Sequence, residues 1–290
     1  MDGNAAPPPI NGVRRYRVSA RGVDLHVTES GDPKGRPVLA LHGWPHHHYT
    51  YRDLLSSPPD GLRVIAPDLP GYGWSGPAPH HWAKQDVADD IVALMDELGL
   101  DRVLLVGHDW GGYIGYLLTL EHPDRIDGFV VAAMSHPWNS GARLFFDSWR
   151  FGHMPLNAVA GRWLMRRTSF LDRVLFPIAA GDDRDRIRDD FRVYSARFRD
   201  PVCAQATLDT YRTFVAHEFP ALVRGGADER TTDVPIRAVV GTKDIITPAM
   251  ASAETARATD YAVEFLPGVG HFVLDEQPEA VRRHLLELAH

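Results

Sequence analysis

A Gly-x-Asp-x-Gly turn between an apolar run and a helical pattern is the feature that most constrains this chain. Apolar residues 103–106 lead into Gly107, and Asp109 and Gly111 follow before a helical pattern over 111–121. Side chains at the two glycines would collide with the neighbouring strand or helix, and the tight turn projects its central side chain at the carboxyl end of a sheet. The pattern therefore predicts a nucleophile elbow in which Asp109 takes the place of the usual serine.

An aspartate at this position has a distinct chemistry. Its carboxylate is already ionised at neutral pH and needs no base to activate it. It attacks carbonyl carbons poorly, but it can attack an sp3 carbon that carries a leaving group, and the resulting ester must then be hydrolysed. Capping of the following helix is the alternative role for Asp109. The preceding strand, both glycines and the partner residues named below favour the nucleophile.

The remaining pattern predicts an α/β fold. Polar and apolar residues alternate on both sides of Arg21-Gly22, which indicates an antiparallel pair of strands. Helical spacing of apolar residues covers 83–98, with Gly99 as a C-cap. Short continuous apolar runs, typical of strands buried on both faces, occupy 37–41, 64–66, 102–106, 129–134 and 236–240. The alternation predicts a mostly parallel central sheet flanked by helices.

This alternation stops between residues 137 and 231. The stretch is rich in Arg, Phe, Trp and Leu and contains no strand-like run, so we expect a helical insertion there. Residues 1–136 and 232–290 would then form the core. Within the insertion, segment 182–190 mixes both signs of charge, which favours a solvated helix face or loop over a binding patch.

Two residues near the C-terminus are candidates for the rest of a catalytic triad. His271 follows the strand-like segment 262–266 and comes last in the order nucleophile, acid, histidine. It can act as the base on the water that cleaves the ester. Asp244 directly follows the run 236–240 and would orient His271. Asp233 and Asp275 are weaker candidates for that role.

Backbone N–H groups could complete the site. Segment 41–45 contains His-Gly-Trp-Pro directly after the apolar run that begins at residue 37. The N–H of Trp44 and the N–H of Trp110 would form an oxyanion hole, since Pro45 has no N–H. An ordinary turn is an equally open interpretation of segment 41–45 taken alone.

Bulk composition excludes several classes of partner. The 290-residue chain has a net charge of -7, which recruits neither nucleic acid nor an anionic membrane. A single cysteine, Cys203, allows no intramolecular disulfide and fits a reducing compartment.

No apolar stretch approaches the roughly 20 residues that span a bilayer. Adjacent histidines at 46–48 lack the spacing of metal ligands. We expect a cytoplasmic monomer or homodimer without a metal.

The order of these motifs resembles that of the α/β-hydrolase-fold epoxide hydrolases, whose near relatives are the haloalkane dehalogenases. The segments that carry the resemblance are 41–45, 68–75, 107–112, Asp244 and 270–272. Trp44 after Gly43 is similar to the epoxide-hydrolase form, whereas dehalogenases often have asparagine there. The resemblance implies a helical cap over the catalytic face, a small-molecule substrate, no cofactor, and opening of epoxides to vicinal diols through an aspartyl ester.

In that family, two cap tyrosines hold the epoxide oxygen. Segment 210–214 resembles the one with the second tyrosine, so Tyr211 is the candidate, with a buried cap aromatic as the alternative. The first tyrosine is expected near 151–155, where this chain has none. His153, whose ring N–H can donate to oxygen, is the candidate there. Tyr194 is another possible donor. Further candidates for the pocket or its mouth are His42, either His46 or His47, and Trp138, Trp149 and Trp163, and core packing is an equally open role for these three tryptophans.

Other functions stay open at this point. A dehalogenase or another aspartate-dependent hydrolase would use the same elbow, and a cyclase or lactonase could use the same scaffold. A non-catalytic protein that binds a small ligand is a third class. All four catalytic positions hold competent residues, which argues against that class.

Overall fold

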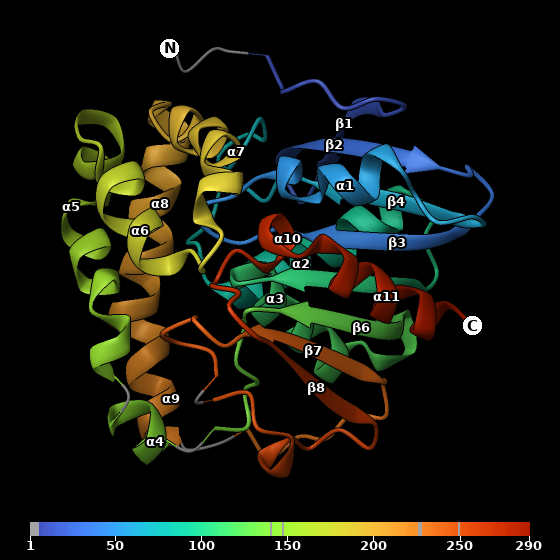
Figure 1. Cartoon of the computed structure of the whole chain (residues 1–290). Coiled ribbons are helices and arrows are strands. Elements are labelled where there is room, and N and C mark those ends of the chain that lie inside the picture. The colour runs from blue at the N-terminus through green and yellow to red at the C-terminus, as the bar shows by residue number, and fades with distance from the viewer. Residues whose placement is uncertain (1–5, 140, 147, 226–227, 249) are drawn as a thin grey trace.

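The fold is built on one central sheet, described here from a computed structural model for residues 6–139, 141–146, 148–225, 228–248 and 250–290 (Figure 1). Its eight strands lie in the order β1-β2-β4-β3-β5-β6-β7-β8. Strand β2 pairs antiparallel with β1 and β4, and the remaining pairings are parallel. The strands are β1 Arg14–Ala20, β2 Val23–Gly31, β3 Arg36–Leu41, β4 Leu62–Pro67, β5 Val103–His108, β6 Ile126–Ala132, β7 Ile236–Gly241 and β8 Tyr261–Leu266. The predicted α/β fold and its mostly parallel sheet are confirmed.

Helices cover both faces of this sheet, and the strand sequences explain why. Successive residues of β3 face opposite ways, so that Leu39 joins one buried apolar cluster and Val38 the other. The first cluster packs under α2 and α3, and the second under α1 and α11. The core helices are α1 Arg52–Ser56, α2 Lys84–Glu97, α3 Trp110–Glu121, α10 Val273–Glu276 and α11 Pro278–Ala289. The helix predicted over 83–98 is confirmed, and Gly99 after it adopts a φ of +62°.

The chain between β6 and β7 is helical throughout its regular segments, and these helices lie together to one side of the sheet (Figure 1). They are α4 Gly141–Phe146, α5 His153–Arg167, α6 Phe176–Ala179, α7 Arg184–Arg197, α8 Pro201–Thr213 and α9 Phe219–Gly225, with π-helical turns η4 Leu171–Leu175 and η5 Phe214–Glu218. We call residues 137–231 the insertion. The charged segment 182–190 runs into α7, whose exposed charges pair along the helix.

Within the part of the chain that the structure describes, no helix is both long and apolar enough to cross a membrane.

Candidate active site

Asp109 occupies the sharp turn between β5 and α3. Its φ of +51° and ψ of -124° lie in a region that residues with a Cβ seldom adopt. The turn needs glycine at both flanks. A Cβ on Gly107 would come within 2.7 Å of the Gly111 carbonyl oxygen, and a Cβ on Gly111 would overlap the Leu41 carbonyl. The sequence therefore positions the carboxylate of Asp109 at the carboxyl edge of the sheet, as predicted for an elbow.

The loop after β3 contacts this carboxylate directly. The backbone N–H of Trp44 donates to Asp109 Oδ1 at 2.8 Å. A Cβ on Gly43 would overlap the Asp109 side chain, so the loop can approach this closely only with glycine there. Trp110 is the first residue of α3, and the first N–H groups of a helix have no acceptor within the helix. The N–H of Trp44 is thus placed to stabilise negative charge on the Asp109 side chain, and the N–H of Trp110 has no acceptor within its own helix.

His271 lies between two carboxylates. Its Nδ1 donates to Asp244 Oδ2 at 2.9 Å, and its Nε2 is 3.5 Å from Asp109 Oδ2. Asp244, in the turn after β7, is itself fixed by the N–H of Ile246 at 2.9 Å and by the hydroxyl of Thr247. The structure thus brings together the three residues that the sequence suggested as nucleophile, base and orienting acid.

Burial and the neighbouring charges act in opposite directions on the pKa values of His271 and Asp109. Burial alone would lower the pKa of His271, but the negative charges of Asp244 and Asp109 outweigh it and raise that pKa to about 10. Burial acts to raise the pKa of Asp109, yet the His271 imidazolium and the Trp44 N–H hold it below its usual value. The resting site therefore contains an imidazolium between two ionised carboxylates.

The main chain on both sides of His271 is held by hydrogen bonds that sequence reasoning missed. The N–H of His271 donates to the carbonyl of Ala179 in the insertion at 2.7 Å. The carbonyl of His271 accepts from His108 Nε2 at 2.9 Å. The carboxylate of Glu276 accepts the N–H groups of Gly270 and Phe272 at 2.9 and 3.2 Å. A carboxylate five residues after the candidate histidine, at the last position of the short helix α10, was the available signal.

A cavity of about 360 Å³ opens above Asp109, between the core loops and the insertion. Asp109, Asp244 and His271 form part of its wall. Most other lining side chains are aliphatic or aromatic and come from the insertion, among them Met154, Phe170, Val174, Phe214 and Phe219. The volume lies within the range of small-molecule sites, and the lining favours an apolar substrate.

Tyr211 and His153 line the same cavity, and their rings lie edge to face with centroids 5.8 Å apart. Tyr211 on α8 is buried, and its ring packs edge-on against Trp44 with centroids 5.2 Å apart. Burial, with the charge of Asp109, raises the pKa of Tyr211 well above its usual value, so its hydroxyl stays protonated. The ring of His153, at the start of α5, stacks on Trp44 at 6.1 Å. Burial lowers the pKa of His153 to about 4, so it is neutral at pH 7.

Two of the pocket residues suggested by the sequence lie outside the cavity, and those suggestions were wrong. Trp138 turns into the core, where its indole N–H donates to the Arg230 carbonyl at 2.8 Å and its ring packs on Tyr116. Its neighbours in sequence, Pro137 and Asn139, do line the cavity. His42 is fully buried, and its Nε2 accepts the N–H of Leu69 at 2.9 Å. His42 thus holds the loop after β3 to the loop after β4.

Of the weaker pocket candidates, Trp149 lies at the cavity and the others lie outside it. Tyr194 donates to Asp275 Oδ1 at 2.6 Å, away from the cavity. His46 and His47 are fully buried and line no part of its mouth. Trp149 is at the rim and is 68% exposed, whereas Trp163 lies on the outer surface of α5.

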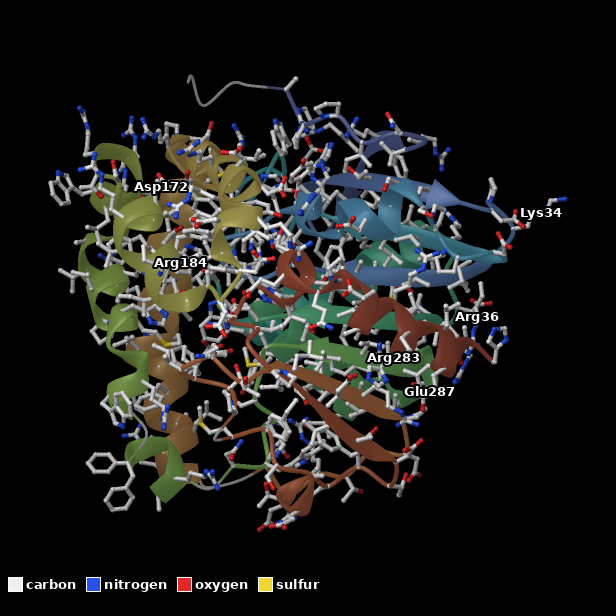
Figure 2. All side chains as sticks on the ribbon, in the orientation of Figure 1. Lys34, Arg36, Asp172, Arg184, Arg283 and Glu287 are labelled. Atoms are coloured by element: carbon white, nitrogen blue, oxygen red, sulfur yellow. The ribbon has the colours of Figure 1, made fainter. Side chains whose placement is uncertain are left out.

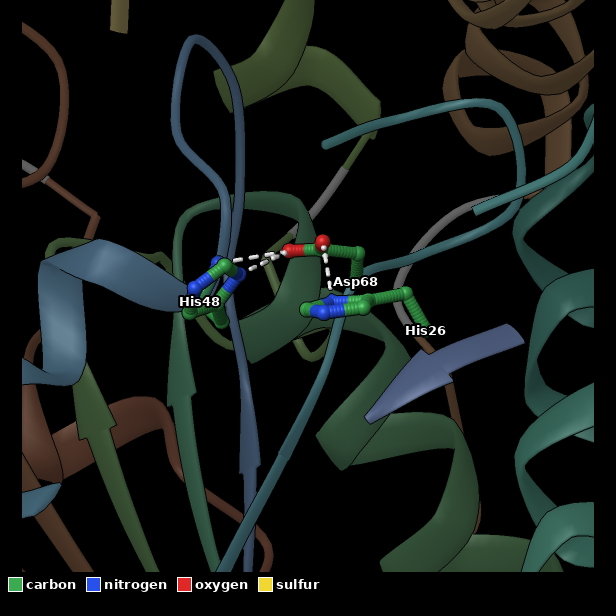
Figure 3. Close-up of side chains that lie close together, drawn as sticks. All are labelled: His26, His48 and Asp68. Carbon is green, nitrogen blue, oxygen red and sulfur yellow. Dashed lines mark hydrogen bonds and ion pairs between the residues drawn. The ribbon is translucent and has the colours of Figure 1, made fainter. Parts of the chain in front are cut away.

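A cluster of metal-ligating side chains lies outside the cavity. His26, His48 and Asp68 converge, and all three are buried (Figure 3). Each imidazole Nδ1 is 2.9 Å from a different oxygen of Asp68. Each oxygen also accepts one backbone N–H, from His48 at 2.8 Å and from Trp74 at 2.9 Å. These four donors satisfy the carboxylate, so we assign the cluster to holding the loops after β3 and β4 against β2.

Lys84 is a second residue that the sequence did not reveal. Its ammonium is fully buried, donates to Glu218 Oε2 at 2.6 Å and to the Thr210 carbonyl at 3.2 Å, and lies 4.4 Å from the centre of the Trp110 ring. The indole Nε1 of Trp110 is buried without a hydrogen-bond partner among the described residues. Lys84 thus links α2 of the core to the insertion directly behind a wall of the cavity.

Comparison with solved structures shows similarity over nearly the whole chain. The structure titled "Epoxide hydrolase CorEH without ligand" aligns with a TM-score of 0.75 and 22% identity, covering 95% of this chain and 98% of that one. The Cif epoxide hydrolase from Acinetobacter nosocomialis aligns with a TM-score of 0.81 and 20% identity, covering 97% and 90%. At these identities the similarity shows the fold.

Sequence comparison also finds similarity to proteins named epoxide hydrolases. Epoxide hydrolase 2 of Siraitia grosvenorii is 40% identical over 141 residues, and this match covers 48% of the chain and 44% of that relative. The chain therefore spans under half of that relative's length. Epoxide hydrolase A of Mycobacterium tuberculosis is 28% identical over 316 aligned positions, covering 93% and 95%. Residues 36–278 match the family described as alpha/beta hydrolase fold. That match includes the elbow and all three residues of the Asp109 group, and the chain belongs to the α/β-hydrolase fold family.

Proposed function

We propose that this protein hydrolyses epoxides to vicinal diols through a covalent ester of Asp109. The observation that carries the proposal is an ionised aspartate, 3.5 Å from His271, in an apolar cavity that a protonated tyrosine also lines. A serine hydrolase would need a hydroxyl at the elbow. A carboxylate there suits attack on a saturated, electrophilic carbon.

In the first half-reaction, a carboxylate oxygen of Asp109 attacks one epoxide carbon. The bond from that carbon to the epoxide oxygen breaks, and the oxygen takes a proton from the hydroxyl of Tyr211, with the neutral ring of His153 as a second donor. Tyr211 suits this role because its proton is retained until a strong base such as an alkoxide forms nearby. The product of this step is a hydroxyalkyl ester of Asp109.

In the second half-reaction, His271 takes a proton from water, which attacks the ester carbonyl. Esterification removes the charge of Asp109, one of the two charges that raise the pKa of His271. The pKa of His271 then falls, and the imidazolium gives its proton to the Tyr211 phenolate that the first step left. The neutral imidazole then serves as the base. The N–H groups of Trp44 and Trp110 stabilise the tetrahedral oxyanion. As the intermediate collapses, the departing alkoxide oxygen takes the proton from His271. The new carboxyl group of Asp109 then returns a proton to His271, which releases the diol and restores the ion pair.

Release of halide from an alkyl halide is the second candidate function. The specific observation in its favour is the indole N–H of Trp110, which is buried, unpartnered among the described residues, and part of a side chain that lines the cavity. A halide leaving group would need such a donor. The hydroxyl of Tyr211 is the better partner for an oxygen leaving group, because it can transfer its proton.

Mass measurement of trapped ester distinguishes the two. We would mix His271→Gln separately with an aryl epoxide and a bromoalkane and record the intact-protein mass. A gain equal to the whole epoxide is expected, since ring opening loses no atoms. A gain of the alkyl group alone, from the bromoalkane only, would assign dehalogenation. Asp109→Ala in the His271→Gln background is the control and should gain no mass. Adducts that persist in that control would contradict Asp109 as the nucleophile.

A further inference from the structure

The outer face of the insertion exposes a cluster of large apolar side chains. On α5, Leu156, Val159 and Trp163 follow helical spacing and lie on one side, with Val159 81% and Trp163 61% exposed. Exposed apolar side chains also occur on α4, in the turn between α4 and α5 and in the segments that follow α5, at Phe145, Phe146, Trp149, Val174 and Ile178. Among the described residues, most of the exposed large apolar side chains of the protein are on these segments.

Arginines surround these apolar residues. Segment 141–178 contains six arginines, no lysine and two acidic residues, although the chain as a whole carries a net charge of -7. On α5, Arg162, Arg166 and Arg167 are exposed beside the apolar stripe. No ion pair with a described carboxylate involves these three arginines. By contrast, the exposed arginines of α7 pair with aspartates three residues away, as Arg188 does with Asp185.

The apolar face reaches the mouth of the catalytic cavity. Trp149, Leu156, Val174 and Ile178 are exposed to solvent and also line the cavity. A molecule that leaves an apolar phase in contact with this face therefore meets apolar side chains on its way into the cavity. Figure 1 places α5 on the side of the insertion away from the sheet.

We propose that this face binds peripherally to an anionic phospholipid surface. Large apolar and tryptophan side chains next to arginines are the composition of surfaces that enter the interface of a bilayer, where the arginines contact lipid phosphates. A symmetric interface with a second copy is disfavoured because the same arginines of both copies would face one another. The proposal revises the expectation, drawn from net charge alone, that the protein has no membrane partner. It is independent of the proposed chemistry.

Co-sedimentation with vesicles tests this surface without substrate. The protein is expected to sediment with phosphatidylglycerol vesicles, to do so less at high salt, and to remain in solution with phosphatidylcholine vesicles. Arg166→Glu should lower the partition coefficient about 30-fold, because it removes one attractive charge and adds one repulsive charge. Lys34→Glu is the charge-matched control, since Lys34 lies at the end of the molecule away from the insertion (Figure 2). It should leave binding unchanged.

A second pair of variants tests the apolar part of the face. Trp163→Ser should weaken vesicle binding several-fold, whereas Phe265→Ser, at an exposed position on β8, should not. Failure of the wild-type protein to sediment with phosphatidylglycerol, or equal losses in Arg166→Glu and Lys34→Glu, would overturn the proposal. So would a concentration-dependent dimer that Trp163→Ser abolishes, because the face would then belong to a second copy. The unfolding midpoints of all variants verify that they are folded.

Discussion

His271 Nε2 lies 3.5 Å from Asp109 Oδ2, so the proposed base of the second half-reaction forms an ion pair with the nucleophile of the first. The imidazole is bonded on its other side to Asp244 at 2.9 Å. Two carboxylates stabilise its positive charge, and only one of them is consumed by esterification. The chemistry of the first step thereby changes the proton affinity of the group that acts in the second.

Neutralising Asp109 should therefore lower the pKa of His271 from its value of about 10. Asp109→Asn removes the charge and keeps the shape of the side chain, as an ester does. NMR titration of labelled histidine would measure the shift, with Asp89→Asn, at a half-buried position on α2, as the control. Identical titration of His271 in wild type and Asp109→Asn would contradict the coupling.

The same ion pairs should make stability depend on pH in a defined window. The pKa of His271 is raised in the folded state from 6.5 to about 10, so its contribution to the free energy of unfolding is complete below pH 6.5. It is lost as the pH rises from 6.5 towards 10. Denaturant unfolding of wild type and His271→Gln across this range should show a stability difference that becomes smaller with rising pH. A stability difference that stays constant across this pH range would contradict the raised pKa of His271.

Tyr211→Phe should lower kcat for an epoxide roughly 100-fold or more, because the oxygen leaving group loses its proton donor. Tyr194→Phe on α7 is the matched control, since its hydroxyl donates to Asp275 and lies outside the cavity. Single-turnover formation of the ester, rather than steady-state turnover, locates the defect in the first half-reaction. An ester that forms at the normal rate in Tyr211→Phe would assign Tyr211 to packing.

His153→Phe tests the second donor. The change keeps a ring to stack on Trp44 and removes the N–H. If His153 shares the leaving oxygen, ester formation should slow roughly tenfold, less than in Tyr211→Phe, because a neutral imidazole is the weaker acid. An unchanged rate would leave Tyr211 as the sole donor and His153 as part of the wall.

The elbow and its partners could be predicted because local sequence determines them. Glycines on both sides of Asp109, and buried runs directly before Asp109 and Asp244, place these side chains at one edge of the sheet regardless of the rest of the chain. Trp138 could not be predicted, because Pro137 and Asn139 line the cavity while the side chain between them turns into the core. Which way such a side chain turns depends on packing against β8 and α3.

The burial of Lys84 could not be predicted from the sequence either, but for a different reason. A single lysine at the start of a helix is usually exposed, and its burial here depends on Glu218, which is 134 residues away. Lys84→Met should destabilise the protein by roughly 2 kcal/mol, because the Thr210 carbonyl and the carboxylate of Glu218 lose a charged donor. Urea unfolding of Lys84→Met, Glu218→Gln and the double variant measures the coupling. Strictly additive losses would mean that the two residues do not act as a pair, and that the core and the insertion are held together elsewhere.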